Sequence, residues 1–507
     1  MENRVQILDT TLRDGEQTSG VSFAIQEKLS ITRLLLEDMN VDRVEIASAR
    51  VSEGELLAAK KVADWAKPKN LIDRIEILGF VDGKTSVDWI CEAGLNVMNL
   101  LCKGSSKHCL KQLGKSEDEH LSDIEYVIEY AKSKGIKVNV YLEDWSHGME
   151  QDKHYVFKFV DCLQKYGIER FMLSDTLGVL NPDTTFEYCT EMLTRYPDLR
   201  FDFHPHNDYG LAVANIYAAI KAGIRTVHTT VNGLGERAGN ASLSSVLPVI
   251  HDQLRLKTSI NENQINRVSK LVETYSGIHI PKNEPVVGEN VFTQVSGVHA
   301  DGDYKYNLYC NGLKPERFGR EREYALGKLS GKANIKKNLE VLGIDLDNEQ
   351  MKRVTDRIIE LGDKKQIVTQ DDLPYIVSDV LKTANTEVRV IITNYSLSLA
   401  QGLKPVANVA VEIDGETYQQ SASGDGQYDA FMKALWKIYD GLGKPHPILT
   451  DYSVTIPPGG RTDSFVQTII TWNLNGTIFK THGFDADQTE AAITATKKML
   501  NIIETIK

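Results

Sequence analysis

The sequence predicts an α/β protein whose first 280 residues fold as a closed (β/α)8 barrel. Eight short apolar runs alternate with helical patterns over this stretch, which is typical of parallel strands joined by helices. No glycine-rich dinucleotide turn follows these runs, which favours closure over the alternative, an open doubly wound sheet. The unusual polar residues follow or end the runs, and barrel enzymes carry their chemistry at the carboxyl ends of strands.

Each expected strand is a short apolar run bounded by polar or turn residues. The eight runs are Val5–Asp9, Arg43–Ile46, Arg74–Gly79, Val97–Leu101, Lys137–Glu143, Arg170–Ser174, Arg200–His204 and Arg225–Thr230. Helical patterns between them include Ile25–Met39, Asp123–Lys134, Tyr155–Tyr166, Asp183–Arg195 and Leu211–Ala222. The polar residues at the strand ends are Asp14, Glu143, Asp175, Thr176, His204, His206 and Asn240.

Two histidines one residue apart, His204 and His206, end the seventh expected strand. In an extended backbone, residues i and i+2 point to the same face, so both rings can aim at one point. Neutral imidazole is the commonest nitrogen ligand for divalent metals. The pattern alone leaves two readings open, a metal site or a polar strand end.

Residues 281–380 differ in texture from the barrel. They open with the proline-bounded run Pro281–Pro285 and contain the glycine-rich run Gly297–Gly302. Helical patterns follow at Ile335–Leu342 and Asn348–Leu361. We expect a linker and a small helical subdomain.

Residues 386–507 predict an α+β domain built from two βββα units, a duplication with a period of roughly 60 residues. The first unit comprises Val388–Thr393, Val406–Ile413, Thr417–Ala422 and the helical Tyr428–Tyr439, and the second comprises Tyr452–Ile456, Ser464–Trp472, Thr477–Thr481 and the helical Gln488–Ile503. An acidic, glycine-containing turn precedes each helix. Helix N-termini bind carboxylates, so the domain suits a regulatory amino acid; a purely structural dimerisation module is the alternative.

The composition is ordinary for a globular chain. The 507 residues are 41% hydrophobic and 25% charged, with a net charge of −12, which argues against nucleic-acid binding as the function. The six cysteines form no C-x-x-C pair, a scatter typical of reduced thiols. No signal peptide precedes the first strand, and no apolar run approaches the roughly 18–20 residues of a membrane span. We expect a cytoplasmic protein without membrane partners.

Three ordered motifs together resemble the α-isopropylmalate, homocitrate and citramalate synthase family. They are Leu12–Gln17, His204–Asp208 and Asn232–Asn240, and the resemblance covers nearly the whole chain. Three further stretches resemble the citramalate synthases of the isoleucine pathway in particular: Val41–Arg50, Asn139–Trp145 and Pro457–Gly460.

The resemblance implies a divalent metal, Mn²⁺, Mg²⁺ or Zn²⁺, on Asp14, His204, His206 and Asn240. Pro205 departs from the family, which usually has a small residue between the two histidines. Proline fixes φ and removes one amide donor, which puts the ligand geometry in question.

The resemblance also implies catalytic roles for Arg13, Glu143 and His299, the last contributed to the neighbouring subunit's site in a homodimer. Read alone, Arg13 suits a surface salt bridge and Glu143 a strand-end carboxylate.

The family condenses acetyl-CoA with a 2-oxo acid and hydrolyses the thioester. The resemblance implies that Thr176 binds the substrate carboxylate and that the oxo acid's side chain contacts Leu78, Leu101 and Tyr141. Read alone, each of these last three is more often a barrel-core residue. The acetyl-CoA side would be lined by Phe80, Asp301, Asn307, Leu308 and Tyr309. Three bulky groups leave room for a methyl, so pyruvate is favoured, and isoleucine is the sensible feedback effector.

Other readings remain open at this point. An α-isopropylmalate synthase would have the same site with a wider pocket. A catalytically dead amino-acid sensor would have no use for Arg13, Asp14, His204, His206 and Glu143. A lyase that cleaves a carbon–carbon bond is a further possibility, although lyase relatives usually lack the C-terminal module.

Overall fold

The computed structural model describes residues 4–295, 302, 308, 311–342, 344–363, 368, 373–381, 389–455 and 466–505. The chain divides into two compact units, one containing the barrel and the other containing the helical and C-terminal regions. Among the described residues, no helix is both long and apolar enough to cross a membrane.

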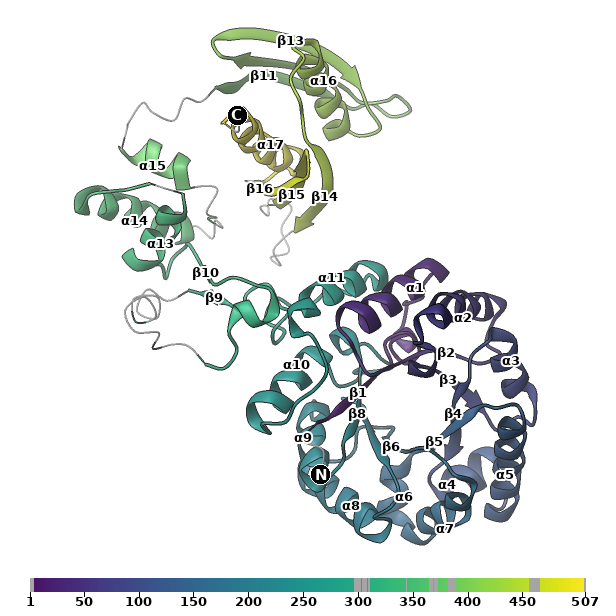
Figure 1. Cartoon of the computed structure of the whole chain (residues 1–507). Helices are drawn as coiled ribbons and strands as arrows, with labels where there is room; N and C mark the ends of the chain where they lie inside the picture. The colour runs from purple at the N-terminus through teal and green to yellow at the C-terminus, as the bar shows by residue number, and fades with distance from the viewer. Residues whose placement is uncertain are drawn as a thin grey trace. The chain divides into compact units, whose positions relative to one another are not determined.

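Eight parallel strands form a closed barrel, as the alternation in the sequence predicts, so the open-sheet alternative is wrong (Figure 1). The strands are β1 (Gln6–Asp9), β2 (Arg43–Ser48), β3 (Ile75–Phe80), β4 (Val97–Lys103), β5 (Lys137–Glu143), β6 (Phe171–Asp175), β7 (Phe201–Pro205) and β8 (Thr226–Thr229). Closure occurs between β1 and β8, where Gln6 pairs with Thr226 and Asp9 with Thr229. Closure brings the carboxyl ends of all eight strands to one mouth.

Helices surround the strands as an outer ring (Figure 1). They are α1 (Ile25–Arg33), α2 (Glu53–Ala66), α3 (Thr85–Ala93), α4 (Ser106–His108), α5 (Glu117–Ser133), α6 (Trp145–Gln151), α7 (Lys153–Leu163), α8 (Pro182–Arg195), α9 (Ala212–Ala222), α10 (Leu243–Pro248) and α11 (Ile265–Ser276). Local sequence fixes where several begin. Ser116 and Glu119 form a capping box at α5, and Asn181 caps α8, whose first residue is proline, as expected at helix starts.

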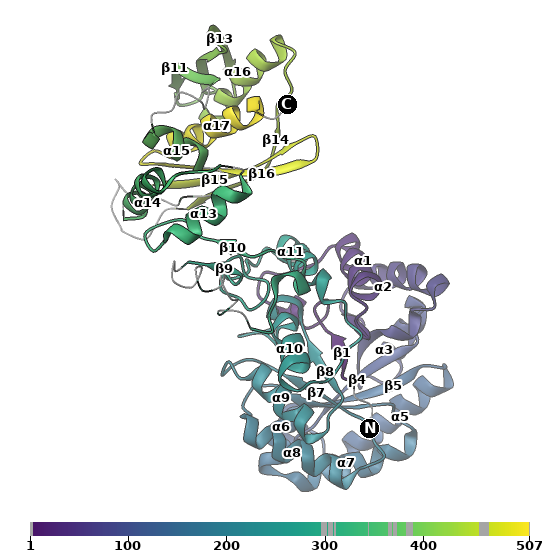
Figure 2. The ribbon, with the colours of Figure 1, turned by 60° about the vertical axis from the view of Figure 1, so that its left-hand side comes forward.

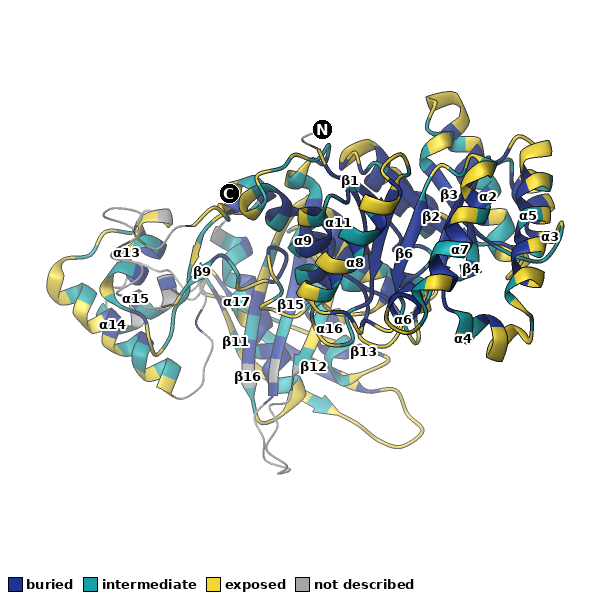
Figure 3. Ribbon diagram, turned by 90° about the horizontal axis from the view of Figure 1, so that it is seen from below, coloured by how far each residue is buried: buried dark blue, intermediate teal, exposed yellow. Residues whose placement is uncertain are grey.

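The main hydrophobic core lies between the strands and these helices. Figure 3 shows the strands as buried and the outer helix faces as exposed. Strands covered by helices on their outer face are nearly continuous apolar runs, which is why charged residues within them, described below, are informative.

Three helices after the barrel, α13 (Lys332–Val341), α14 (Asn348–Asp363) and α15 (Leu373–Leu381), lie together (Figures 1 and 2). They share a small core that includes Ile335, Ile358 and Leu373. Helices α13 and α14 fall where the sequence predicts them. Helix α15 was not anticipated; Leu373-Pro374 opens it, and proline is compatible with a first helical turn.

The C-terminal domain has the two predicted βββα units. The first comprises β11 (Val390–Ser398), β12 (Val406–Ile413), β13 (Glu416–Ser423) and α16 (Gln427–Gly441), and the second comprises β14 (Ile448–Thr455), β15 (Val466–Leu474), β16 (Thr477–Asp485) and α17 (Gln488–Thr505). Each sheet is antiparallel in chain order. Both βββα units bury side chains in one shared core, so the duplication forms a single folded domain.

Candidate metal centre and active site

The turn after β1 carries Arg13 and Asp14 and is held from several sides. The backbone amides of Arg13, Asp14 and Gly15 all donate to the Thr10 carbonyl, at 3.1, 2.8 and 3.1 Å. The fully buried Lys28 donates from Nζ to the Leu12 carbonyl at 3.2 Å and pairs with two carboxylates, Glu16 and Glu55, each at 2.7 Å. The turn is therefore fixed before any ligand binds.

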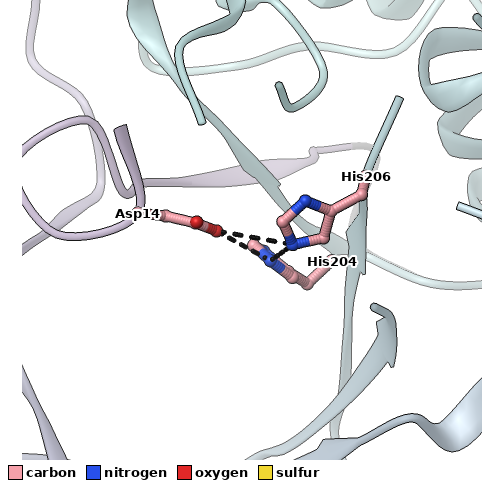
Figure 4. Close-up of side chains that lie close together, drawn as sticks. All are labelled: Asp14, His204 and His206. Atoms are coloured by element: carbon pink, nitrogen blue, oxygen red, sulfur yellow. Dashed lines mark hydrogen bonds and ion pairs between the residues drawn. The ribbon is translucent and has the colours of Figure 1, made fainter. Parts of the chain in front are cut away.

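Asp14, His204 and His206 converge inside the barrel mouth (Figure 4). The Nε2 atom of His204 lies 3.0 Å from Asp14 Oδ2, and that of His206 lies 3.8 Å from the same oxygen. The two Nε2 atoms are 3.4 Å apart. All three residues are buried, and each offers one ligand atom within 4.8 Å of the others. Pro205 lies between the histidines within β7 and does not prevent this convergence.

The protonation states suit a metal. Burial raises the pKa of Asp14, but Arg13, His204 and His206 outweigh it and hold that pKa well below its usual range. Burial lowers the pKa of His206 to about 4, and burial also lowers the pKa of His204. The carboxylate is therefore charged and the imidazoles are neutral near pH 7, the forms that coordinate divalent cations.

Asn240 adds a fourth group with the right chemistry. It forms an isolated bridge with His206, and its Nδ2 donates to the Leu234 carbonyl at 3.0 Å. Its Oδ1 is buried and has no hydrogen-bond partner among the described residues. A side chain at Gly235 would place Cβ 2.2 Å from Asn240 Nδ2, so glycine is needed for the loop to pass this close. Two oxygens and two imidazole nitrogens fit Mn²⁺, Mg²⁺ or Zn²⁺.

The Arg13 side chain is only 8% exposed and lies beside this cluster, so the surface salt-bridge reading is wrong. Its Nε donates to Glu45 Oε2 at 2.5 Å, its Nη1 lies 3.4 Å from Asp14 Oδ2, and its Nη2 donates to the Tyr141 hydroxyl at 3.3 Å. Burial opposes the charge, but Glu45 and Asp14 raise the pKa of Arg13. A fixed cation thus lies next to the metal-binding groups.

A polar network fills the barrel interior close to Arg13, and the sequence analysis assigned none of it except Tyr141. Glu45, Glu76 and Asp202 are buried acids on β2, β3 and β7. Arg43 and Arg170 each lie within salt-bridge distance of both Glu76 and Asp202. Other members are Asn99, Asn139, Tyr141 and His228. The available signal was an ionisable residue inside an expected strand, as in Val44-Glu45-Ile46 and Val227-His228-Thr229.

The structure brings the expected substrate-contacting residues together. Leu78 and Tyr141 form a small apolar cluster with Leu8 and Met172, separate from the main core, and Phe80 and Leu101 pack against it. Tyr141 also contacts Arg13 through its hydroxyl and its ring face, with the guanidinium 5.6 Å from the ring centroid. The cluster therefore adjoins the charged part of the site.

Glu143 ends β5 and forms an ion pair with Lys103, which ends β4. Thr176 follows β6. Its Oγ1 accepts from the Asp144 amide at 2.8 Å, and its carbonyl accepts from Arg237 Nη2 at 2.8 Å. Since the amide occupies a lone pair, the Thr176 hydroxyl proton can donate to a bound carboxylate.

Five expected residues lie after the barrel. His299, Asp301, Asn307 and Tyr309 lie outside the described residues. Leu308 is described and its side chain is exposed. Their roles stay predictions.

Buried acid, imidazole and amide groups at the mouth of a (β/α)8 barrel, with a fixed arginine beside them, form a potential metal site of the kind that barrel enzymes carry at this end. Protein-family models match three consecutive parts of this chain. Residues 4–272 match the HMGL-like family, residues 286–366 the homocitrate synthase post-HMGL domain-like family, and residues 367–504 the LeuA allosteric (dimerisation) domain.

Relatives span almost the entire chain. A Methanopyrus kandleri protein named provisionally as an (R)-citramalate synthase is 37% identical, covering 92% of this chain and 89% of its own. An (R)-citramalate synthase of Methanocaldococcus jannaschii is 32% identical, covering 98% and 99%. A 2-isopropylmalate synthase of the same organism is 34% identical, covering 99% and 95%.

The chain belongs to the HMGL-like family, in the group that contains citramalate and 2-isopropylmalate synthases. It is an acyltransferase of the condensing type, and metal dependence is typical of its family. The reading as a catalytically dead sensor is therefore wrong.

Proposed function

We propose that this enzyme condenses acetyl-CoA with pyruvate to give (R)-citramalate and CoA, the first step of a threonine-independent route to isoleucine. The observation that carries the proposal is the apolar cluster containing Leu78 and Tyr141, with Leu101 packed on it, next to Arg13. These bulky side chains leave room for the methyl group of pyruvate more readily than for an isopropyl group. One methylene in such a pocket is worth about 1–3 kcal/mol, so the preference can be strong without being absolute.

Asp14, His204, His206 and Asn240 would hold the divalent metal. When bound, the metal supplies Lewis-acid polarisation of the keto group of the 2-oxo acid. The chain's own residues do the rest. Arg13 stabilises negative charge on the oxygen that develops during attack, and Thr176 orients the substrate by donating its hydroxyl proton to the carboxylate.

Glu143 acts as the base in this proposal. It removes a proton from the methyl group of acetyl-CoA, and the resulting carbon attacks the keto carbon of pyruvate. Water then cleaves the thioester and releases CoA. By resemblance, Phe80, Asp301, Asn307, Leu308 and Tyr309 bind the acetyl-CoA side, and the partner subunit's His299 helps to activate the nucleophile or the water.

We also propose a cytoplasmic homodimer regulated by isoleucine through the C-terminal domain. The match to an allosteric (dimerisation) domain over residues 367–504 supports both dimerisation and an effector. The described cysteines, Cys91, Cys102, Cys109, Cys162 and Cys189, are all free thiols, which supports a reducing compartment.

A second candidate is 2-isopropylmalate synthase, which the 34% identity to a 2-isopropylmalate synthase favours. The test is release of free CoA from acetyl-CoA with pyruvate, 2-oxobutyrate or 2-oxoisovalerate in turn. We expect the highest kcat/KM with pyruvate. A higher value with 2-oxoisovalerate would promote the second candidate, and cleavage of a preformed product without condensation would indicate a lyase.

A further inference from the structure

His228 lies on β8 inside the barrel and is almost completely buried, with 2% of its surface exposed. Both ring nitrogens are engaged. Nδ1 lies 3.2 Å from the Tyr141 hydroxyl, and Nε2 lies 3.3 Å from Asp202 Oδ2. The ring also packs edge-on against Tyr141 and His204, with centroids 5.6 and 5.2 Å apart. Neither nitrogen is left to coordinate a metal, so His228 is a different kind of histidine from its neighbours His204 and His206.

The charges around Asp202 fix the direction of these hydrogen bonds. Asp202 Oδ2 lies 3.4 Å from Arg43 Nη2 and 3.5 Å from Arg170 Nε. A carboxylate held between two guanidinium groups is ionised and can only accept hydrogen bonds. The His228 Nε2 therefore carries the ring hydrogen and donates it to Asp202. In the neutral ring, Nδ1 is then an acceptor.

The direction of the His228 hydrogen bonds also determines the direction of those between Tyr141 and Arg13. Two acceptors face the Tyr141 hydroxyl, His228 Nδ1 at 3.2 Å and Glu45 Oε2 at 3.5 Å. Glu45 Oε2 already accepts from Arg13 Nε at 2.5 Å, so the Tyr141 hydroxyl donates its single proton to the nearer acceptor, His228 Nδ1. The lone pairs of that hydroxyl oxygen remain for Arg13, whose Nη2 lies 3.3 Å away. Asp202, His228, Tyr141 and Arg13 thus form one directed chain of hydrogen bonds that runs from β7 through β8 and β5 to the turn after β1.

We propose that His228 is a positioning residue that sets the substrate preference through its hydrogen bond to Tyr141. By accepting the Tyr141 proton, it fixes the tyrosine ring as a wall of the 2-oxo acid pocket and presents the hydroxyl oxygen to Arg13. Tyr141 then acts as a wall and an acceptor, and it is not a proton donor to the substrate. The inference rests on the proposed function for the pocket, but the hydrogen-bond direction itself does not.

The test is a double-mutant cycle between His228 and Tyr141. His228→Leu removes both ring interactions, whereas His228→Asn keeps a side-chain oxygen that can accept from Tyr141. Tyr141→Phe removes only the hydroxyl. We measure kcat and KM for pyruvate and for 2-oxobutyrate in the single variants and in His228→Leu/Tyr141→Phe.

We expect His228→Leu to lower the pyruvate to 2-oxobutyrate ratio of kcat/KM by about tenfold, the size of one hydrogen bond, chiefly through KM. His228→Asn should stay within about threefold of wild type for the same reason. In the Tyr141→Phe background, His228→Leu should add less than about twofold, because coupled residues are non-additive. Equal effects of His228→Leu in both backgrounds would overturn the proposal, as would a loss in His228→Asn as large as that in His228→Leu.

A second readout does not depend on turnover. Nitrogen-15 spectra of histidine-labelled protein report which ring nitrogen carries hydrogen, and the His228 signal is the one lost in His228→Asn. We expect the Nε2–H form in wild type and a shift of the Nδ1 signal in Tyr141→Phe. A Nδ1–H form would overturn the inference. An enzyme that turned over no 2-oxo acid would contradict the proposed function and would leave this readout intact.

Discussion

Lys103 and Glu143 pair in register at the ends of β4 and β5, and their side chains form an ion pair at the mouth of the barrel. The backbone of Lys103 is anchored on both sides. Its amide donates to His120 Nε2 at 3.1 Å, and its carbonyl accepts from the Tyr155 hydroxyl at 2.9 Å. Lys103 is therefore a fixed cation that orients the carboxylate of the proposed base.

Replacing Lys103 with methionine should lower kcat by about tenfold or more, because general-base catalysis contributes 10²–10⁴-fold and depends on orientation. KM for pyruvate should change little. The matched control is Lys115→Met, which removes an exposed pair with Asp123 and should leave kcat unchanged. Steady-state kinetics on both variants decide the matter, and an unchanged kcat in Lys103→Met would remove Lys103 from the mechanism.

Removing one of the proposed metal ligands should strongly weaken metal binding while the fold survives. Asp14→Ala, His204→Ala and His206→Ala each delete one of the converging groups at the mouth, and Asn240→Ala deletes the buried oxygen that lacks a partner. We expect Mn²⁺ affinity to fall at least about 100-fold in the first three, because losing even a residue that only supports a ligand typically costs about 10–100-fold. The control is His279→Ala, whose side chain is 94% exposed. Calorimetric titration with Mn²⁺ and far-UV circular dichroism give the answer. A variant that binds Mn²⁺ like wild type would place the metal elsewhere.

Lys28→Met should be strongly destabilising. Lys28 Nζ is buried against Glu16, Glu55 and the Leu12 carbonyl, and breaking a buried pair by removing one partner costs about 3–5 kcal/mol. The turn carrying Arg13 and Asp14 should loosen at the same time, so Mn²⁺ affinity should fall as well. Lys60→Met, which breaks an exposed pair with Glu92, should change the free energy of unfolding by less than about 1 kcal/mol. Denaturant titration of both variants measures this; equal effects would mean that the buried pair stabilises nothing.

His120 makes stability depend on pH. Burial lowers its pKa from 6.5 to about 4, so between these values the unfolded chain binds the proton first. The stabilising contribution is complete above pH 6.5 and is lost as the pH falls toward 4. Within this window, the stability advantage of wild type over His120→Gln should shrink by about 1.4 kcal/mol per pH unit. The other buried histidines are present in both proteins, so their contributions cancel in the stability difference between wild type and His120→Gln. Denaturant titrations from pH 4 to 7 test this, and a constant difference would contradict it.

Much of the fold and the centre of the site could be predicted from the sequence, because both depend on local pattern. Alternating runs give the strands and helices, and the positions of His204 and His206 on one strand give their common direction. The polar interior could not be predicted. Arg43 contacts Asp202, which lies 159 residues later in the chain. No pattern in either strand indicates that these two residues pair. His228 and Lys28 each lie among other polar residues in the sequence, and only the closed barrel shows what they contact.

The last prediction concerns feedback through the C-terminal domain, where the two acidic turns differ. Asp487 Oδ1 accepts from the amides of Thr489 and Glu490 and so caps α17 itself. Gly426 precedes α16 and provides no side-chain cap, so the first amides of α16 are more available to a ligand carboxylate. Asp425, beside them, is exposed and paired only with Lys404 among its charged neighbours in the described residues, and it can pair with a ligand ammonium.

We therefore expect isoleucine to inhibit the full-length enzyme, with leucine weaker, and Asp425→Asn to raise the inhibitory concentration by about tenfold, the size of a charged hydrogen bond. Asp451→Asn, at an exposed position on β14, is the control and should leave it unchanged. Deleting residues 386–507 should remove the inhibition while Mn²⁺ binding by the barrel remains, although kcat can fall if the dimer loosens. Calorimetric titration of the full chain with isoleucine, leucine and valine completes the test. No heat and no thermal shift with any of the three would leave the domain as a structural dimerisation element.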